Sequence, residues 1–263
     1  MKKILALILA LTMVFAMAAC GAKDTGTTPE TPETPETPST PVADVKSEGV
    51  MTYAEYDAAA LESSVVIEAY VQGKQAYSTE YGNTSIYAQD SDGAYFIYRM
   101  PCTQEEYDKI AIGSKIKVTG YKAEWSGEFE ITDAKFEILE GNYVAEKLDV
   151  TALLASDELI KHQNKAVAIK GATVAASKDA NGNDVAFLYN WDGSGQEGSD
   201  LYFNVTVNGA TYNFCVESDL CGADTDVYAA VKALNIGDTI DLEGFLYWYN
   251  GANPHITAVT KAQ

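Results

Sequence analysis

The sequence is poor in the basic residues from which nucleic-acid-binding surfaces are usually built. It has one arginine, Arg99, and its 18 basic residues stand against 38 acidic ones, which gives a net charge of −20. Nucleic-acid binders take most of their affinity from Lys and Arg placed at phosphates. The charge therefore disfavours nucleic acid as a partner. The acidic excess is typical of a solubilising surface.

The common catalytic motifs are also missing. The chain has no GxSxG sequence, no phosphate-binding loop and no HExxH sequence. Its two histidines, His162 and His255, lie far apart with no CxxC or HxxxH nearby, so no zinc site is indicated. Among the acids, the best cluster is Glu124, Glu128 and Glu130, which the second half of the chain does not repeat. We therefore expect a protein that is not an enzyme and has no cofactor.

Cysteine is scarce, and its number is odd after Cys20. At most one pair can form among Cys102, Cys215 and Cys221. Cys215 and Cys221 are close enough in sequence for a small disulfide loop, and three free thiols are the alternative. The sequence leaves both open.

The first twenty residues have the layout of an export signal. Lys2 and Lys3 precede an apolar run from Ile4 to Met17, which ends at Ala18, Ala19 and Cys20. A run this short, with basic residues before it and small residues after it, predicts a cleaved signal peptide over 1–19.

The end of this run, Met17-Ala18-Ala19-Cys20, resembles the bacterial lipobox. That resemblance implies lipidation of Cys20 and a mature protein attached by lipid to the extracytoplasmic face of the cell membrane. The alternative is an ordinary secretory signal with an incidental cysteine. Cleavage before Cys20 removes two lysines and leaves 16 basic and 38 acidic residues, a net charge of −22.

The segment 20–48 is predicted to be a disordered linker. It repeats Thr-Pro-Glu and holds five of the seven prolines of the chain between Thr28 and Pro41. Regular proline favours an extended chain at ~3.1 Å per residue, so this stalk could reach on the order of 80 Å.

The rest of the chain contains one unit twice. The clearest match aligns Ile112 to Tyr121 with Ile236 to Phe245, and in both segments two glycines stand seven residues apart. Just beyond, Trp125-Ser126-Gly127 corresponds to Tyr249-Asn250-Gly251. Such self-similarity predicts two copies of one fold, a first domain over 49–142 and a second over 143–263.

Each copy is predicted to have three strands, one helix and two more strands. In the first copy the alternating strands are 65–71, 84–89, 94–98, 115–122 and 128–139, and Thr103 with Glu106 forms a capping box that starts the helix. In the second copy the helix is 225–234. A short helix is also expected before each set of strands, one starting at a capping box of Thr52 with Glu55 and the other over 151–161. This order is that of the five-stranded OB barrel. The predicted fold is all-β with short helices, as two tandem five-stranded OB-fold barrels.

Residues of about 50 to 263 resemble the tandem OB-fold domains of secreted lipoproteins from Firmicutes such as clostridia, through glycine placement and strand order. The resemblance implies a ligand site on strands two and three, bordered by the first-to-second and fourth-to-fifth strand loops.

Aromatic residues concentrate at this expected ligand site. The candidate ligand-binding residues are Tyr87, Tyr95, Tyr98 and Trp125 in the first copy, and Trp191, Tyr202, Tyr212, Trp248 and Tyr249 in the second. Surrounded by Asn, Asp and Glu, such rings would stack on sugars, whereas with Lys and Arg they would stack on bases. Packing is the alternative explanation.

A weak Ca²⁺ candidate lies in the enlarged first loop of the second copy. Asp179, Asn181 and Asp184 place oxygen-bearing side chains near one another, but the glycine and the glutamate of an EF-hand loop are misplaced or absent. A solvated turn is the favoured interpretation.

From the sequence we expect a non-catalytic, surface-displayed binding or scaffold lipoprotein whose ligand is a glycan, a peptide or an envelope protein. Two alternatives remain. One is capture of single-stranded nucleic acid, suggested by the OB resemblance alone, and the other is an accessory domain of a hydrolase.

Overall fold

The computed structural model describes residues 46–261. The signal peptide, Cys20 and nearly all of the predicted linker lie outside the described residues. The described residues all belong to one compact unit. Within the described part, no helix is both long enough and apolar enough to cross a membrane.

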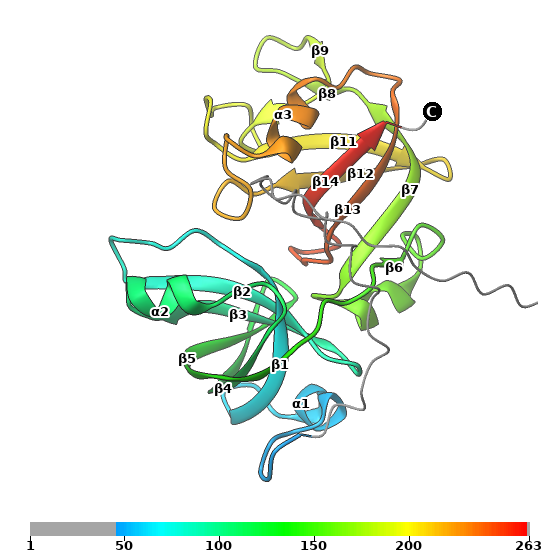
Figure 1. Ribbon diagram of the computed structural model, residues 1–263. Coiled ribbons are helices and arrows are strands. Elements are labelled where there is room, and N and C mark those ends of the chain that lie inside the picture. Colours follow the sequence, from blue (N-terminus) through cyan, green and yellow to red (C-terminus); the bar gives the residue numbers. More distant parts are fainter. Residues whose placement is uncertain (1–45, 262–263) are drawn as a thin grey trace, which may run out of the picture. The chain divides into compact units, whose positions relative to one another are not determined.

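The first half of the described chain forms a closed five-stranded barrel (Figure 1). Its strands are β1 (Ser64–Lys74), β2 (Asn83–Gln89), β3 (Ala94–Pro101), β4 (Ser114–Trp125) and β5 (Glu128–Asn142), in the order β1-β2-β3-β5-β4. Two short helices accompany them, α1 (Tyr53–Ala58) before β1 and α2 (Gln104–Lys109) between β3 and β4. Both begin with the predicted capping boxes, at Thr52 with Glu55 and at Thr103 with Glu106.

The second half repeats this topology. Strands β7 (Ala166–Ala175), β11 (Leu201–Val207), β12 (Ala210–Val216), β14 (His255–Lys261) and β13 (Thr239–Phe245) are neighbours in that order, and β11 also pairs with β7, which closes the barrel. Helix α3 (Asp226–Lys232) lies between the third and fourth strands. The additional elements are β6 (Leu148–Asp149), β8 (Ser177–Lys178), β9 (Asp184–Val185) and β10 (Leu188–Tyr189). The predicted fold is therefore confirmed as two five-stranded OB barrels with few, short helices.

One expected helix has a different form. The segment 151–161 is mostly turn, and its regular part is the 3₁₀-helix η1 (Asp157–His162), with Ser156 as its N-cap. The tighter winding of a 3₁₀-helix is common in short connecting segments such as this one, which ends three residues before β7.

The repeated glycines have the same structural roles in both barrels. Gly113 and Gly237 have φ of 87° and 93° in the turn before the fourth strand, a conformation that side chains disfavour. At Gly120 and Gly244 the fourth strand approaches the fifth too closely for a Cβ, which would lie 2.7 Å from the carbonyl oxygen of Thr132 or 2.2 Å from that of His255. The register of the fourth strand shifts at both sites. The glycines repeated in the sequence are therefore the residues that allow the fourth strand to approach the fifth in each barrel.

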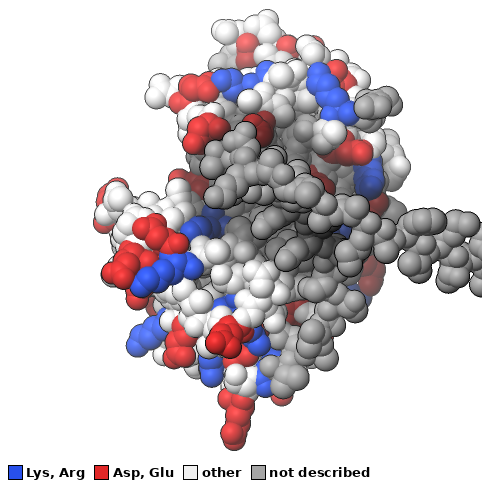
Figure 2. All heavy atoms as spheres, in the orientation of Figure 1, with Lys and Arg blue, Asp and Glu red and all other residues white. Residues whose placement is uncertain are grey.

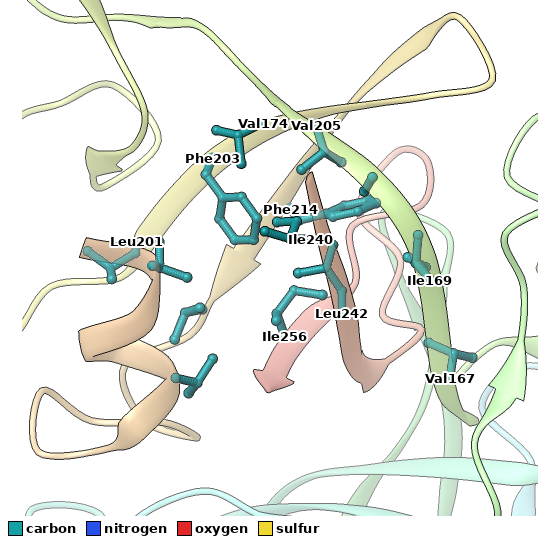
Figure 3. Close-up of a cluster of buried hydrophobic side chains, with 14 of the residues drawn as sticks. Val167, Ile169, Val174, Leu201, Phe203, Val205, Phe214, Ile240, Leu242 and Ile256 are labelled. Carbon is teal, nitrogen blue, oxygen red and sulfur yellow. The ribbon is translucent and has the colours of Figure 1, made fainter. Parts of the chain in front are cut away.

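Each barrel has its own apolar core. Figure 3 shows the core of the second barrel, where side chains from β7, β11, β12, β13 and β14 point inward. In this core the rings of Phe203 and Phe214 meet edge to face, with centroids 6.3 Å apart. Ile67, Ile97 and Ile131 are fully buried in the first core. The strands alternate inward apolar residues with outward residues, and the outward ones form the faces available to ligands.

Candidate functional site

The outer face of β2 and β3, which is the usual ligand face of an OB barrel, is largely buried in the first barrel by residues of the second. Tyr87 and Phe96 form a small apolar cluster with Ala166 and Phe245. The rings of Tyr87 and Phe245 are stacked, and Tyr247 meets Phe96 edge to face at 5.5 Å. This part of the face is an interface between barrels.

Buried hydrogen bonds extend this interface. The hydroxyl of Tyr87 lies 2.9 Å from Nδ1 of His255, and the backbone N–H of Ala166 donates to Oε1 of Gln89 at 2.9 Å. Burial lowers the pKa of His255 to about 4, so its imidazole is neutral at physiological pH. The bond to Tyr87 is thus between neutral groups.

The fourth-to-fifth strand loops of the two barrels also meet. The N–H of Asn250 donates to the carbonyl oxygen of Ser126 at 2.7 Å, and the N–H of Trp248 donates to Oε2 of Glu128 at 2.9 Å. Trp125 and Tyr249, beside these contacts, are more than half exposed. The loops predicted to border two separate sites therefore form one joint rim with exposed aromatic rings.

Glu128 and Glu130 are buried next to this rim. Burial raises the pKa of Glu128 to about 9 and that of Glu130 to about 7. The oxygens Glu128 Oε1 and Asn164 Oδ1 are both buried acceptors without a donor, although the two side chains are within hydrogen-bonding contact. Burial therefore outweighs the contacts with Asn164 and with the N–H of Trp248, both of which lower the pKa of Glu128.

The end of the first barrel's ligand face remains open as a cavity of about 360 Å³. We call it the Arg99 cavity. Its walls are the loop between β1 and β2, the start of β2, the end of β3 and two acids that follow β12: Gln75, Ala76, Tyr77, Ser78, Tyr81, Asn83, Thr84, Ser85, Tyr98, Arg99, Glu217 and Asp219. It therefore lies where the OB topology places a ligand.

Arg99 is exposed and has two unusual features. It is the single arginine of the chain, and its φ of 45° is one that non-glycine residues rarely adopt. Its guanidinium lies 5.1 Å from the ring centroid of Tyr98 and 5.6 Å from that of Tyr81. Among the described residues it makes no ion pair. Strained backbone that presents a cation between two aromatic rings is typical of a binding site.

The bulged conformation has a local cause. The register of β2 and β3 shifts beside Ser85, whose hydroxyl accepts a hydrogen bond from the N–H of Arg99 at 3.1 Å. A bulge of this kind re-aims a side chain at the edge of a sheet. Here it directs the side chain of Arg99 over the tyrosine rings.

The two acids reduce the positive potential of the Arg99 cavity, but not equally. Burial raises the pKa of Glu217 to about 7, and Gln75 donates to its Oε1 at 2.6 Å. Asp219 is exposed. Elsewhere on the visible surface, basic side chains are scattered among acidic ones (Figure 2). The cavity thus offers a ligand one cation, one exposed carboxylate, aromatic rings, hydroxyls and amides.

The corresponding face of the second barrel is neutral and more open. Asn213 donates to Oδ1 of Asn204 at 2.9 Å, Thr206 pairs with Thr211 at 3.3 Å, and Tyr202 lies next in the ladder. Asn204 and Thr206 are partly exposed, whereas Thr211 and Asn213 are exposed. This amide and hydroxyl ladder can donate and accept hydrogen bonds but carries no charge.

The aromatic residues predicted to bind a ligand differ in how far the structure exposes them. Tyr87 and Tyr95 are buried, Tyr95 in the core with its hydroxyl donating to Asp90 at 3.0 Å. Neither ring is available to a ligand in this arrangement. Tyr212 and Trp248 pack against the second core, and Tyr202 is partly exposed. Trp125, Trp191 and Tyr249 are exposed, and Tyr98 is partly exposed like Tyr202.

The remaining sequence candidates lie in simpler surroundings. Asp179 uses its carboxylate to accept hydrogen bonds from Asn181 and Asn183 within its own turn, and Asp184 pairs with Lys178 at 2.8 Å. These contacts explain the turn without an ion.

Cys102, Cys215 and Cys221 are free thiols, the last two buried. The sequence had left open a disulfide between Cys215 and Cys221 or three free thiols, and the structure has the free thiols.

Comparison with known proteins gives similarities of structure only. No protein-family model and no curated protein matches the chain. A murine DNA-binding protein bound to double-stranded DNA is 14% identical with a TM-score of 0.36, covering 75% of this chain and 99% of that one. The single-stranded DNA-binding protein of Thermus aquaticus, as a deletion mutant, is 14% identical with a TM-score of 0.27, covering 76% and 94%. A replication protein A heterotrimer bound to single-stranded DNA is 11% identical with a TM-score of 0.29, covering 81% and 52%.

These comparisons correct one prediction. The net charge disfavoured nucleic acid as a partner, yet solved structures similar to this chain include complexes with DNA, which contradicts that exclusion. We transfer no ligand or binding residue from structures this distant.

Arg99 was not among the site residues predicted from the sequence. The feature that could have indicated it is its position as the single arginine of the chain, directly after the candidate residue Tyr98.

Proposed function

We propose that this protein binds single-stranded nucleic acid and that the Arg99 cavity holds part of the strand. The observation that carries the proposal is the placement of Arg99 over Tyr98 and Tyr81 at the end of an OB ligand face. A guanidinium can pair with a phosphate while neighbouring rings stack on bases, and both contacts tolerate any sequence. The protein acts by binding, with no chemical step assigned.

The acidic composition sets the mode of binding. A surface with one arginine at its site neutralises few phosphates, so most of the affinity must come from stacking and from hydrogen bonds to bases. The affinity should therefore depend only weakly on salt, with a log–log slope of about −1 or shallower for single strands. A basic binder of the same size would show a much steeper slope.

The test is a titration of fluorescein-labelled oligothymidine of about 16 nucleotides, followed by fluorescence anisotropy at low and at moderate salt. Neutral oligosaccharides serve as unlabelled competitors. We expect saturable binding, loss of about tenfold in affinity for Arg99→Ala, and little change for Lys170→Ala, which removes an equal charge on β7. Absence of binding at low salt, an unchanged affinity in Arg99→Ala, or displacement by an oligosaccharide would each overturn the proposal.

We further propose that the protein is exported and held at the outer face of the cell membrane by a lipid on Cys20. The support is the sequence alone, with Lys2 and Lys3 before an apolar run that ends in Met17-Ala18-Ala19-Cys20. A lipid-tethered binder on a proline-rich linker would capture strands outside the cell. A clostridial or other Firmicutes origin is a proposal from the resemblance of residues of about 50 to 263 to tandem OB-fold lipoproteins.

A further inference from the structure

A buried ion pair ties the start of the described chain to the first barrel. Lys46, which precedes α1, places its Nζ 2.5 Å from Oδ2 of Asp90, the residue that follows β2. The side chain of Lys46 is 11% exposed, and that of Asp90 is completely buried. The Lys46 ammonium also donates to the carbonyl oxygen of Glu68 at 3.1 Å, which fixes its position. An amine and a carboxyl group are thus held together out of water.

The ion pair also holds the nitrogen of Lys46 close to the carboxyl carbon of Asp90. Because Oδ2 is bonded to Cγ, Nζ is at most about 3.7 Å from Cγ. Reacting atoms in a near-attack geometry are about 3–3.5 Å apart, and fixing two groups in such a geometry removes much of the entropy cost of their reaction. The pair therefore has the geometry of an amine next to the carbon that it could attack.

The second carboxyl oxygen of Asp90 accepts from two backbone donors. Its Oδ1 accepts hydrogen bonds from the N–H groups of Asp92 and Gly93, at 2.8 and 2.7 Å. Attack of an amine on Cγ would place negative charge on Oδ1, and paired N–H groups at this distance stabilise such an oxyanion. The turn between β2 and β3 therefore provides an oxyanion hole for a reaction of Asp90 itself.

The oxygen that faces Lys46 has a hydrogen-bond donor of its own. The hydroxyl of Tyr95, on β3, donates to Oδ2 of Asp90 at 3.0 Å. Burial and the neighbouring charge of Asp90 raise the pKa of Tyr95, so this hydroxyl keeps its proton. A donor placed at a leaving oxygen assists its departure. A nucleophile, an oxyanion hole and a donor for the leaving oxygen thus meet at one carboxyl group.

We propose that Lys46 and Asp90 form an isopeptide bond within the folded protein. One proton of the Lys46 ammonium passes to the Asp90 carboxylate, and the neutral amine attacks Cγ. The bond between Cγ and Oδ2 then breaks, a second proton leaves the nitrogen, and Oδ2 departs as water with both protons. One C–N bond replaces one C–O bond, so the step consumes no oxidant or reductant. The Asp90 side chain is closed to solvent, which protects the product from hydrolysis.

The bond gives the first barrel a covalent attachment at its linker side. It closes a loop that contains α1, β1 and β2. A pull on the linker is then carried through the side chain of Lys46 to the turn after β2, and α1 and β1 are not drawn out of the fold. Such a cross-link suits a domain held on a tether, and it is independent of strand binding at the Arg99 cavity.

The experiment is mass spectrometry of the whole, denatured protein, followed by tryptic peptide mapping. We expect the protein to be lighter by one water molecule than the mass calculated for its chain, and to yield a branched peptide in which Lys46 is joined to Asp90. Lys46→Arg should show neither, because a guanidinium stays protonated and is no nucleophile. Lys109→Arg, at an ion pair with Glu105 that is exposed on both sides, is the matched control and should show both.

Two further variants test the chemistry. Asp90→Asn should give the same branched peptide by losing ammonia in place of water. Tyr95→Phe keeps the ring and removes the hydroxyl, so part of the chains should remain without the bond. Complete cross-linking in Tyr95→Phe would overturn the role given to this hydroxyl.

The contrary results are equally distinct. An intact mass without loss of water would refute the isopeptide bond and leave an ordinary buried ion pair. A loss of water that persists in Lys46→Arg would also refute it, because the loss would then arise elsewhere, for example in a cyclic imide at Asp92-Gly93. Lys46→Arg can keep the ion pair with Asp90, so it is expected to fold, which circular dichroism would check. Because the readout is a mass, neither result depends on whether the Arg99 cavity binds a strand.

Discussion

The ring of Tyr87, on β2 of the first barrel, stacks on the ring of Phe245, at the end of β13 of the second, with centroids 4.3 Å apart and planes inclined by 6°. Tyr87 is 1% exposed and Phe245 6% exposed. Each ring hides apolar surface of its partner, and together they occupy the face that an isolated OB barrel would offer to a ligand. The two barrels therefore stabilise one another at the expense of one binding face.

This contact predicts a measurable loss of stability. Phe245→Ala should lower the free energy of unfolding by about 3 kcal/mol, because it leaves a cavity between buried rings. Urea denaturation followed by circular dichroism would measure the change. Tyr121→Ala, which removes an aromatic ring that is 48% exposed, is the matched control and should shift stability by about 0.5 kcal/mol or less. A loss at Phe245 no larger than at Tyr121 would show that the interface contributes little.

A second prediction concerns pH and Glu128. Burial raises the pKa of this acid from 4.5 to about 9 in the folded protein. The folded state therefore holds a proton that the unfolded state releases above pH 4.5, so the contribution of Glu128 to stability is lost as pH rises from there to about 9. Thermal unfolding across this range should show a falling melting temperature.

The variant that isolates this effect is Glu128→Gln. Its amide oxygen can accept from the N–H of Trp248, as the carboxyl of Glu128 does, and the amide carries no charge at any pH. We expect the variant to be more stable than the native protein at pH 8, by about 1 kcal/mol or more, and to lose much of the pH dependence. Glu124→Gln, at an exposed position, is the control. Equal pH profiles for native protein and Glu128→Gln would mean that Glu128 is ionised in the fold.

More of the fold than of the candidate site could be predicted from the sequence. Gly120 and Gly244 could be recognised as equivalent because barrel closure imposes the same close approach in each copy, and the capping boxes are local. The burial of Tyr87 could not be recognised, since the pairing with Phe245 joins residues far apart in sequence and depends on how one barrel meets the other. The aromatic pattern of a ligand face and that of an interface are the same.

The prediction for Cys20 is independent of the described structure. Mass spectrometry of the protein made in its native host should find a diacylated N-terminal cysteine, and Cys20→Ala should move to the soluble fraction, because the acyl chains supply most of the membrane affinity. A variant that still sediments with membranes would indicate another means of attachment. Cys102→Ala, at a partly buried thiol, is the control for loss of a cysteine as such.

The last prediction separates the conformation of Arg99 from its charge. A φ of 45° costs a non-glycine residue on the order of 1 kcal/mol, and glycine adopts it freely. Arg99→Gly should therefore be more stable to urea than Arg99→Ala by about that amount, whereas both should lose oligothymidine binding equally because both lack the guanidinium. If Arg99→Gly were instead the less stable of the two, the backbone at this position would be unstrained. The bulge would then be a property of the sheet and not a conformation that binding requires.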